Sequence, residues 1–137
     1  MSYRDIAKSQ LRIDEGVRGK PYRDTVGKLT IGVGRNLDDV GLSPDEIDYL
    51  LDNDVTNAEI VARILFPSFN SLSDNRRAAI INMALNLGQE RLAGFHDMRA
   101  AVERQDWAGA ATAMLDSRWA GQVGKRADRL AQMIKEG

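Results

Sequence analysis

The chain has 137 residues, a net charge of −1, 43% hydrophobic and 28% charged side chains, and no cysteine. This composition is that of a globular domain with its own core, and it excludes a disordered segment. The lack of cysteine excludes disulfides, a thiolate nucleophile and thiolate metal sites. No stretch approaches the ~18 apolar residues of a membrane span, and no signal peptide is visible. We therefore expect synthesis in a cytoplasm and no insertion into membranes.

Charge is distributed unevenly along the chain. Residues 1–60 carry 8 basic and 12 acidic side chains, whereas residues 61–137 carry 11 basic and 8 acidic ones. A net charge of +3 in the second part is typical of an ordinary solvated surface, and no nucleic-acid-binding motif accompanies it. We expect no nucleic-acid partner.

The N-terminal part changes from helix to strand. Ser2 followed by Asp5 predicts the start of a helix, and apolar residues at helical spacing continue it to about Glu15. Residues 20–24 and 28–33 are typical of two short strands around a turn at 25–27.

The motif at residues 43–46 is a strong helix start, because Ser43 can cap the helix, Pro44 suits its first position and Glu46 completes a capping box. The helix should continue for about twenty residues, roughly 30 Å, until Pro67. A helix of that length can connect two lobes. Further helices are expected over residues 73–88, 95–105, 106–116 and 125–135. The predicted fold class is α+β, with a small β-hairpin and a mainly helical second half.

Carboxylates are the best candidates for chemistry, since one histidine and no cysteine leave little for metal sites or nucleophile–base pairs. We expect no metal and no cofactor. Glycoside hydrolysis needs an acid for the leaving oxygen and a second carboxylate. Glu15 ends a helix, where the helix dipole disfavours negative charge and so favours a protonated acid. Asp24 and Thr30 can lie across the hairpin from each other. By spacing alone, a surface glutamate, a turn aspartate and a strand threonine explain the pattern equally well.

Several segments resemble the phage-type lysozymes related to phage T4 lysozyme, glycoside hydrolase family 24. The N-terminal signature covers residues 11–16, 22–25 and 29–34, and places Glu15, Asp24 and Thr30 at the spacing of the family. The resemblance continues, in the same order, through residues 76–80, 82–83, 88, 93–95, 117–119 and 126–127. It is therefore collinear over nearly the whole chain.

The resemblance implies a single lysozyme-like domain over residues 1–137. In this arrangement 13–65 form the β-containing lobe with the connecting helix, and 1–12 and 66–137 form the helical lobe. It also implies hydrolysis of the β-1,4 bond between N-acetylmuramic acid and N-acetylglucosamine in bacterial peptidoglycan, by a monomer that reaches the cell wall after release from the host cytoplasm.

Carried over by position, the resemblance makes Glu15 the general acid, Asp24 the second carboxylate and Thr30 its partner in placing water. Arg126 matches an arginine that approaches the catalytic glutamate. The implied substrate-binding residues are Gly32, Leu85, Asn86, Arg118 and Arg126.

The chain departs from the family pattern in four places. Arg35 stands where the family often carries histidine, so any ion pair there involves a permanently charged group. Fewer residues separate Gly34 from the long helix. Leu85-Asn86 replaces a bulkier aromatic–amide pair, and the C-terminus is shorter. These departures concern substrate subsites rather than the three catalytic positions.

Two alternatives remain open. A lytic transglycosylase needs the acid but no carboxylate to activate water, and the presence of Asp24 and Thr30 argues against it. A cell-wall-binding or phage structural module could keep the fold without catalysis, because function resides in the site rather than in the fold.

Overall fold

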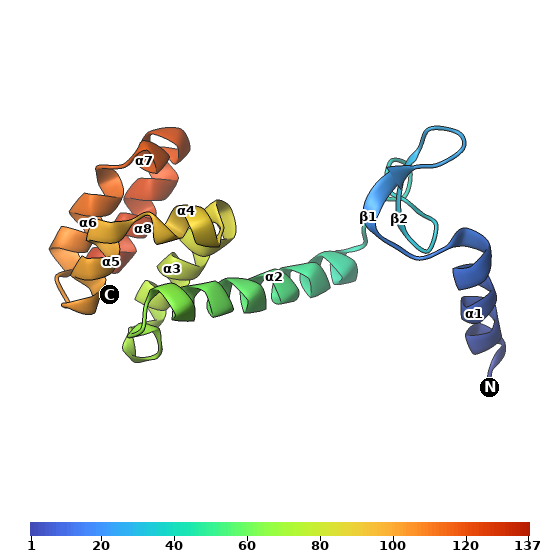
Figure 1. Ribbon diagram of the computed structural model, residues 1–137, viewed down its shortest axis with the longest axis horizontal. Coiled ribbons are helices and arrows are strands. Elements are labelled where there is room, and N and C mark those ends of the chain that lie inside the picture. Colours follow the sequence, from blue (N-terminus) through green and yellow to red (C-terminus); the bar gives the residue numbers. More distant parts are fainter. The chain divides into compact units, whose positions relative to one another are not determined.

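The computed structural model describes residues 1–137 and contains eight α-helices, one 3-10 helix and three strands (Figure 1). The elements in chain order are α1 (Tyr3–Glu15), β1 (Arg18–Arg23), β2 (Leu29–Gly32), β3 (Arg35–Asn36), α2 (Pro44–Leu65), η1 (Phe69–Ser71), α3 (Asp74–Leu87), α4 (Gln89–Ala93), α5 (His96–Glu103), α6 (Trp107–Leu115), α7 (Arg118–Val123) and α8 (Lys125–Glu136). The predicted lysozyme-like α+β class is confirmed.

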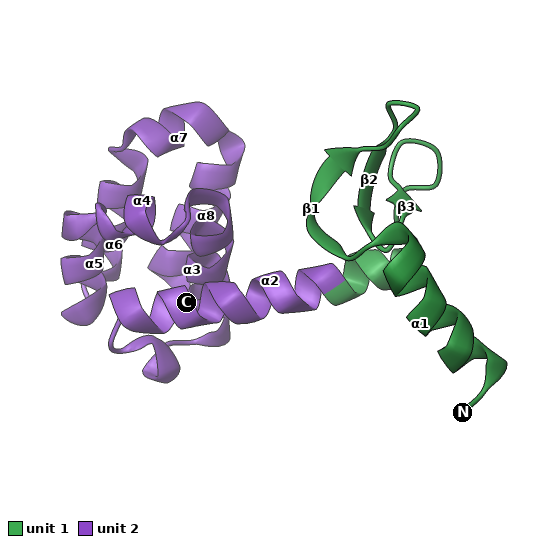
Figure 2. Ribbon diagram, turned by 45° about the vertical axis from the view of Figure 1, so that its right-hand side comes forward, with its two compact units in different colours: residues 1–49 green, residues 50–137 purple.

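The chain divides into two compact units, residues 1–49 and 50–137, which Figure 2 colours separately. The prediction that residues 1–12 belong with 66–137 stays a prediction. No helix combines the length and the apolar character that crossing a membrane requires.

In the first unit, α1 begins as the sequence predicts. The Ser2 hydroxyl accepts the backbone N–H of Asp5 at 3.2 Å, and the Asp5 carboxylate accepts that of Ser2 at 3.1 Å. This reciprocal capping box satisfies two donors that the first helical turn would otherwise leave without partners. Helix α1 ends at Glu15, as predicted.

The sheet is antiparallel, with strand order β1-β2-β3. Tyr22 pairs with Thr30 and Arg23 with Leu29, while Thr30 also pairs with Asn36 of β3. The predicted hairpin is confirmed with slightly different boundaries. The third strand was not predicted, because two residues are too few to show an alternating pattern.

In the second unit, helices α3 to α8 and the C-terminal part of α2 surround one apolar core. The largest fully buried side chains are Phe66, Ile80, Met83, Leu92, Met98, Val102, Met114, Leu130 and Ile134. Trp119 is also buried and meets the ring of Phe95 edge to face at 6.1 Å between centroids. The short helices α4 and α7 were not predicted, since five or six residues span less than two turns.

One ion pair connects β3 to the first turn of α2. Nη1 of Arg35 donates to Oε1 of Glu46 at 2.7 Å and to the carbonyl of Gly41 at 3.1 Å. The backbone N–H of Ser43 donates to the same Glu46 oxygen at 2.8 Å. The hydrogen bond from Arg35, followed by that from Ser43, lowers the pKa of Glu46 to about 2. The pair therefore fixes the loop that joins the sheet to the helix.

Glu46→Gln should lower the free energy of unfolding at pH 7 and flatten its dependence on acid pH. Because folding depresses the pKa of Glu46 from 4.5 to about 2, the stabilisation is complete above pH 4.5 and is lost as pH falls through about 2. Urea unfolding at several pH values measures this. Glu59→Gln is the control, since Glu59 forms only a surface pair with Arg63 at 3.5 Å. An unchanged acid dependence in Glu46→Gln would contradict the assignment.

Candidate active site

Glu15 is the last residue of α1, and its exposed side chain turns toward the loop between β2 and β3. There its carboxyl group lies against Gly34. No side chain or backbone amide of the protein donates a hydrogen bond to this carboxyl group, and the side chain as a whole is exposed.

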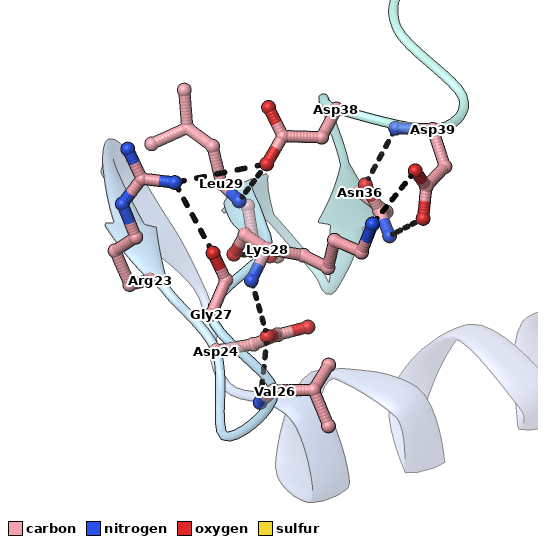
Figure 3. Close-up of polar contacts among 10 residues, drawn as sticks. Arg23, Asp24, Val26, Gly27, Lys28, Leu29, Asn36, Asp38 and Asp39 are labelled. Carbon is pink, nitrogen blue, oxygen red and sulfur yellow. Dashed lines mark hydrogen bonds and ion pairs between the residues drawn. The ribbon is translucent and has the colours of Figure 1, made fainter.

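Asp24 closes the turn between β1 and β2 (Figure 3). Its Oδ1 accepts two backbone N–H groups, from Val26 at 3.0 Å and from Lys28 at 2.8 Å. Its own N–H donates to the carbonyl of Lys28 at 2.9 Å, which continues the strand ladder by one step. The carboxylate is thus held in one orientation with Oδ2 left without a partner in the protein. An aspartate whose side chain accepts backbone N–H groups a few residues later is typical of a turn.

Thr30 is the one buried polar side chain of the molecule, with 3% of its surface exposed. Its hydroxyl donates to the carbonyl of Lys28 at 3.0 Å, so only its lone pairs remain to accept a hydrogen bond. Because Thr30 pairs with Tyr22 and side chains alternate along a strand, Thr30 and Asp24 lie on the same face of the hairpin. The structure places these two predicted residues on one face of the hairpin.

The neighbouring loop is ordered by polar contacts that were not predicted from the sequence (Figure 3). Asp38 accepts the backbone N–H of Leu29 at 2.7 Å, and Asp39 accepts Nζ of Lys28 at 3.1 Å. Asn36 donates to Asp39 at 3.0 Å. The hydrogen bond and the charge of Asp39 raise the pKa of Lys28. The signal was the group of short polar side chains after Arg35, namely Asn36, Asp38 and Asp39, which is typical of turns closed by side chains.

In the second unit, two predicted substrate-binding residues share a groove of about 560 Å³. Leu85 and Arg126 line it together with Asn82. Nε and Nη2 of Arg126 both donate to Oδ1 of Asn82, at 2.9 and 2.7 Å. Asn82 therefore orients the guanidinium, and it was not among the predicted site residues. Its position one helical turn before Asn86 gave no indication of this contact.

The remaining predicted residues lie elsewhere. Gly32 ends β2 opposite Arg18 of β1. Oδ1 of Asn86 accepts Nε1–H of Trp119 at 2.8 Å, which commits that oxygen to packing α3 against α7. Arg118 begins α7 and does not line the groove. The contact of Arg126 with Glu15 stays a prediction. No three His, Asp or Glu side chains lie close enough together to hold a metal ion.

Comparisons with known proteins assign the chain to a family. The family model described as phage lysozyme matches residues 12–133. The chain belongs to the phage lysozyme family. At the level of the family it is therefore a lysozyme-type muramidase, a glycoside hydrolase whose substrate is peptidoglycan.

Three known proteins are moderately similar to the chain. Two probable T4-type lysozymes of Dictyostelium discoideum, numbers 2 and 1, are 27% and 28% identical, over 95% of this chain and 94% of each relative. The pre-baseplate central spike protein Gp5 of Enterobacteria phage T4 is 28% identical over 93% of this chain, which matches 27% of that longer protein. The matched region includes all of the predicted site residues, from Glu15 to Arg126.

Asn82→Ala should lower the free energy of unfolding by about 1–2 kcal/mol, because the guanidinium of Arg126 loses both of its hydrogen bonds. Asn75→Ala is the matched control. Asn75 lies on the same helix, is exposed and makes no side-chain hydrogen bond, so its replacement should change stability by less than about 0.5 kcal/mol. Chemical denaturation measures the free energy of unfolding of both variants. Equal losses would show that Asn82 does not anchor Arg126.

Proposed function

We propose that the protein hydrolyses the β-1,4 bond between N-acetylmuramic acid and N-acetylglucosamine in bacterial peptidoglycan. Glu15 acts as the general acid, while Asp24 and Thr30 place the attacking water. The observation that carries this proposal is the Asp24 carboxylate, which two backbone amides hold by one oxygen while the other stays free. A preoriented free oxygen is what a water-directing carboxylate requires.

The hydrogen-bond acceptors left free on Asp24 and Thr30 support one arrangement of the attacking water. A water molecule has two protons to donate, and both Oδ2 of Asp24 and the lone pairs of the Thr30 hydroxyl are acceptors. Donating to both leaves the lone pairs of the water free to attack the anomeric carbon. As the bond to that carbon forms, Asp24 takes the proton that the water gives up.

Glu15 supplies the other proton of the reaction. Its carboxyl group protonates the glycosidic oxygen as the bond breaks, so the leaving sugar departs as a neutral alcohol. The exposed position of Glu15 and its lack of internal hydrogen bonds support this role, because its proton must be delivered to a polymer that arrives from solvent.

Glu15→Gln should reduce the lysis of outer-membrane-permeabilised cells at least about 100-fold, since an amide cannot donate the proton that general acid catalysis requires. Turbidity loss measures the rate. Glu90→Gln is the matched control, because Glu90 is exposed and makes no side-chain hydrogen bond. We expect Glu90→Gln to keep the wild-type rate, and the proposal fails if Glu15→Gln keeps it too.

Product analysis separates this proposal from a lytic transglycosylase. Attack by water leaves a reducing muramic acid end, whereas a transglycosylase leaves a 1,6-anhydro end. The anomeric configuration of the fresh reducing end also tells whether water attacks directly, with inversion, or resolves a covalent intermediate, with retention. We expect a reducing end formed by direct attack of water.

A second candidate follows from the match to part of the central spike protein. In that candidate the domain is a cell-wall-binding or structural module of a virion and does not cut glycan. Binding to purified sacculi without release of soluble glycan would favour it.

For the muramidase we propose synthesis in the host cytoplasm and action on the wall after release.

A further inference from the structure

The loop between β2 and β3 approaches Glu15 more closely than any side chain at position 34 would allow. A β-carbon added to Gly34 would lie 2.9 Å from Oε2 of Glu15, 3.0 Å from its Cδ and 3.1 Å from its Cγ. Carbon atoms pack best at about 3.5–4.0 Å. Cγ, Cδ and Oε2 of Glu15 therefore lie on the side of Gly34 that a β-carbon would occupy in any other residue.

We propose that Gly34 is a positioning residue for Glu15: the missing β-carbon leaves the space in which the carboxyl group of the acid lies. The consequence for catalysis rests on the proposed function, in which Glu15 is the general acid. The contact itself does not depend on it.

Backbone conformation alone does not explain this glycine. Gly34 and Gly41 both have positive φ, +68° and +67°, which disfavours any other residue. A β-carbon on Gly41 would meet only the carbonyl oxygen of Leu37, at an ordinary 3.8 Å. Gly16, Gly27 and Gly32 also have positive φ, with nothing within 4 Å of an added β-carbon. In the first unit, residues 1–49, only Gly34 combines a positive φ with a side chain packed against the position of its missing β-carbon.

A β-carbon at position 34 should displace Glu15 and leave the loop in place. The loop is held on both sides by the pairing of Ile31 with Arg35, and Arg35 is itself fixed by Glu46 and by the Gly41 carbonyl. Glu15, by contrast, has a flexible side chain with no hydrogen bond inside the protein. To restore an optimal separation, Oε2 would have to retreat by about 0.6 Å.

Such a displacement matters for a proton donor. A misplacement of about 1 Å can cost about 100-fold in rate, because the reacting atoms leave the geometry of near attack. Substrate binding, which many groups share, should change much less. The expected signature is a fall in kcat with little change in KM.

The test compares Gly34→Ala with Gly41→Ala, which place the same residue at nearly the same φ. On a soluble peptidoglycan oligosaccharide, Gly34→Ala should lose between about 10-fold and 100-fold in kcat, with KM within about twofold. Gly41→Ala should keep kcat within about twofold, although both variants should lose similar stability. The ¹³C resonance of the Glu15 carboxyl should move in Gly34→Ala alone. Equal kcat in the two variants, or an unmoved Glu15 resonance, would overturn the proposal.

A measurement on the wild-type protein covers the case in which Gly34→Ala does not fold. A nuclear Overhauser effect between the Hα protons of Gly34 and the Hγ protons of Glu15 should be observed, and its absence would overturn the contact. This readout is independent of catalysis. If Glu15→Gln were fully active while the Overhauser effect persisted, the proposed function would fail and the contact between Gly34 and Glu15 would stand.

Discussion

The hydrogen bonds from Val26 and Lys28 to Oδ1 of Asp24 fix the arrangement on which the rest of the first unit depends. They close the turn, and the turn sets the register that pairs Tyr22 with Thr30. A slip of one residue would turn Thr30 to the opposite face and expose the one buried hydroxyl of the molecule. The same two bonds therefore determine strand register and the placement of two candidate catalytic side chains.

Because the hydrogen bonds to Asp24 also determine strand register, most substitutions of Asp24 would change structure as well as activity. A replacement that removes the carboxylate also removes the acceptor for two backbone N–H groups, so loss of activity and loss of structure would be hard to separate. Asparagine is the exception, because its side-chain oxygen can still accept both hydrogen bonds while the second oxygen is replaced by a donor. Glu15 differs, since its carboxyl group makes no hydrogen bond within the protein.

The sequence was most informative where local chemistry decides structure. The capping box at Ser2 and the motif at residues 43–46 gave the starts of α1 and α2 because caps act within one helical turn. Strand β3 could not be predicted in this way, since its two residues become a strand only by pairing with β2.

The candidate site likewise contains residues that the sequence predicts and contacts that it does not predict. Glu15, Asp24 and Thr30 were found through a chain-long resemblance, whereas spacing alone left them ambiguous. Asn82 is far from Arg126 in sequence, and the approach of Gly34 to Glu15 also joins separate segments. Both contacts arise only when the chain folds, so neither could be found in a local pattern.

Arg35 has a consequence for the conditions under which the first unit stays assembled. A histidine at this position would lose its charge near neutral pH, and an ion pair with it would weaken under mildly alkaline conditions. Glu46 raises the already high pKa of Arg35, while Arg35 keeps Glu46 ionised down to acid pH. Neither partner titrates in the neutral range. The connection between the sheet and α2 is therefore insensitive to the pH differences between growth media, hosts and compartments.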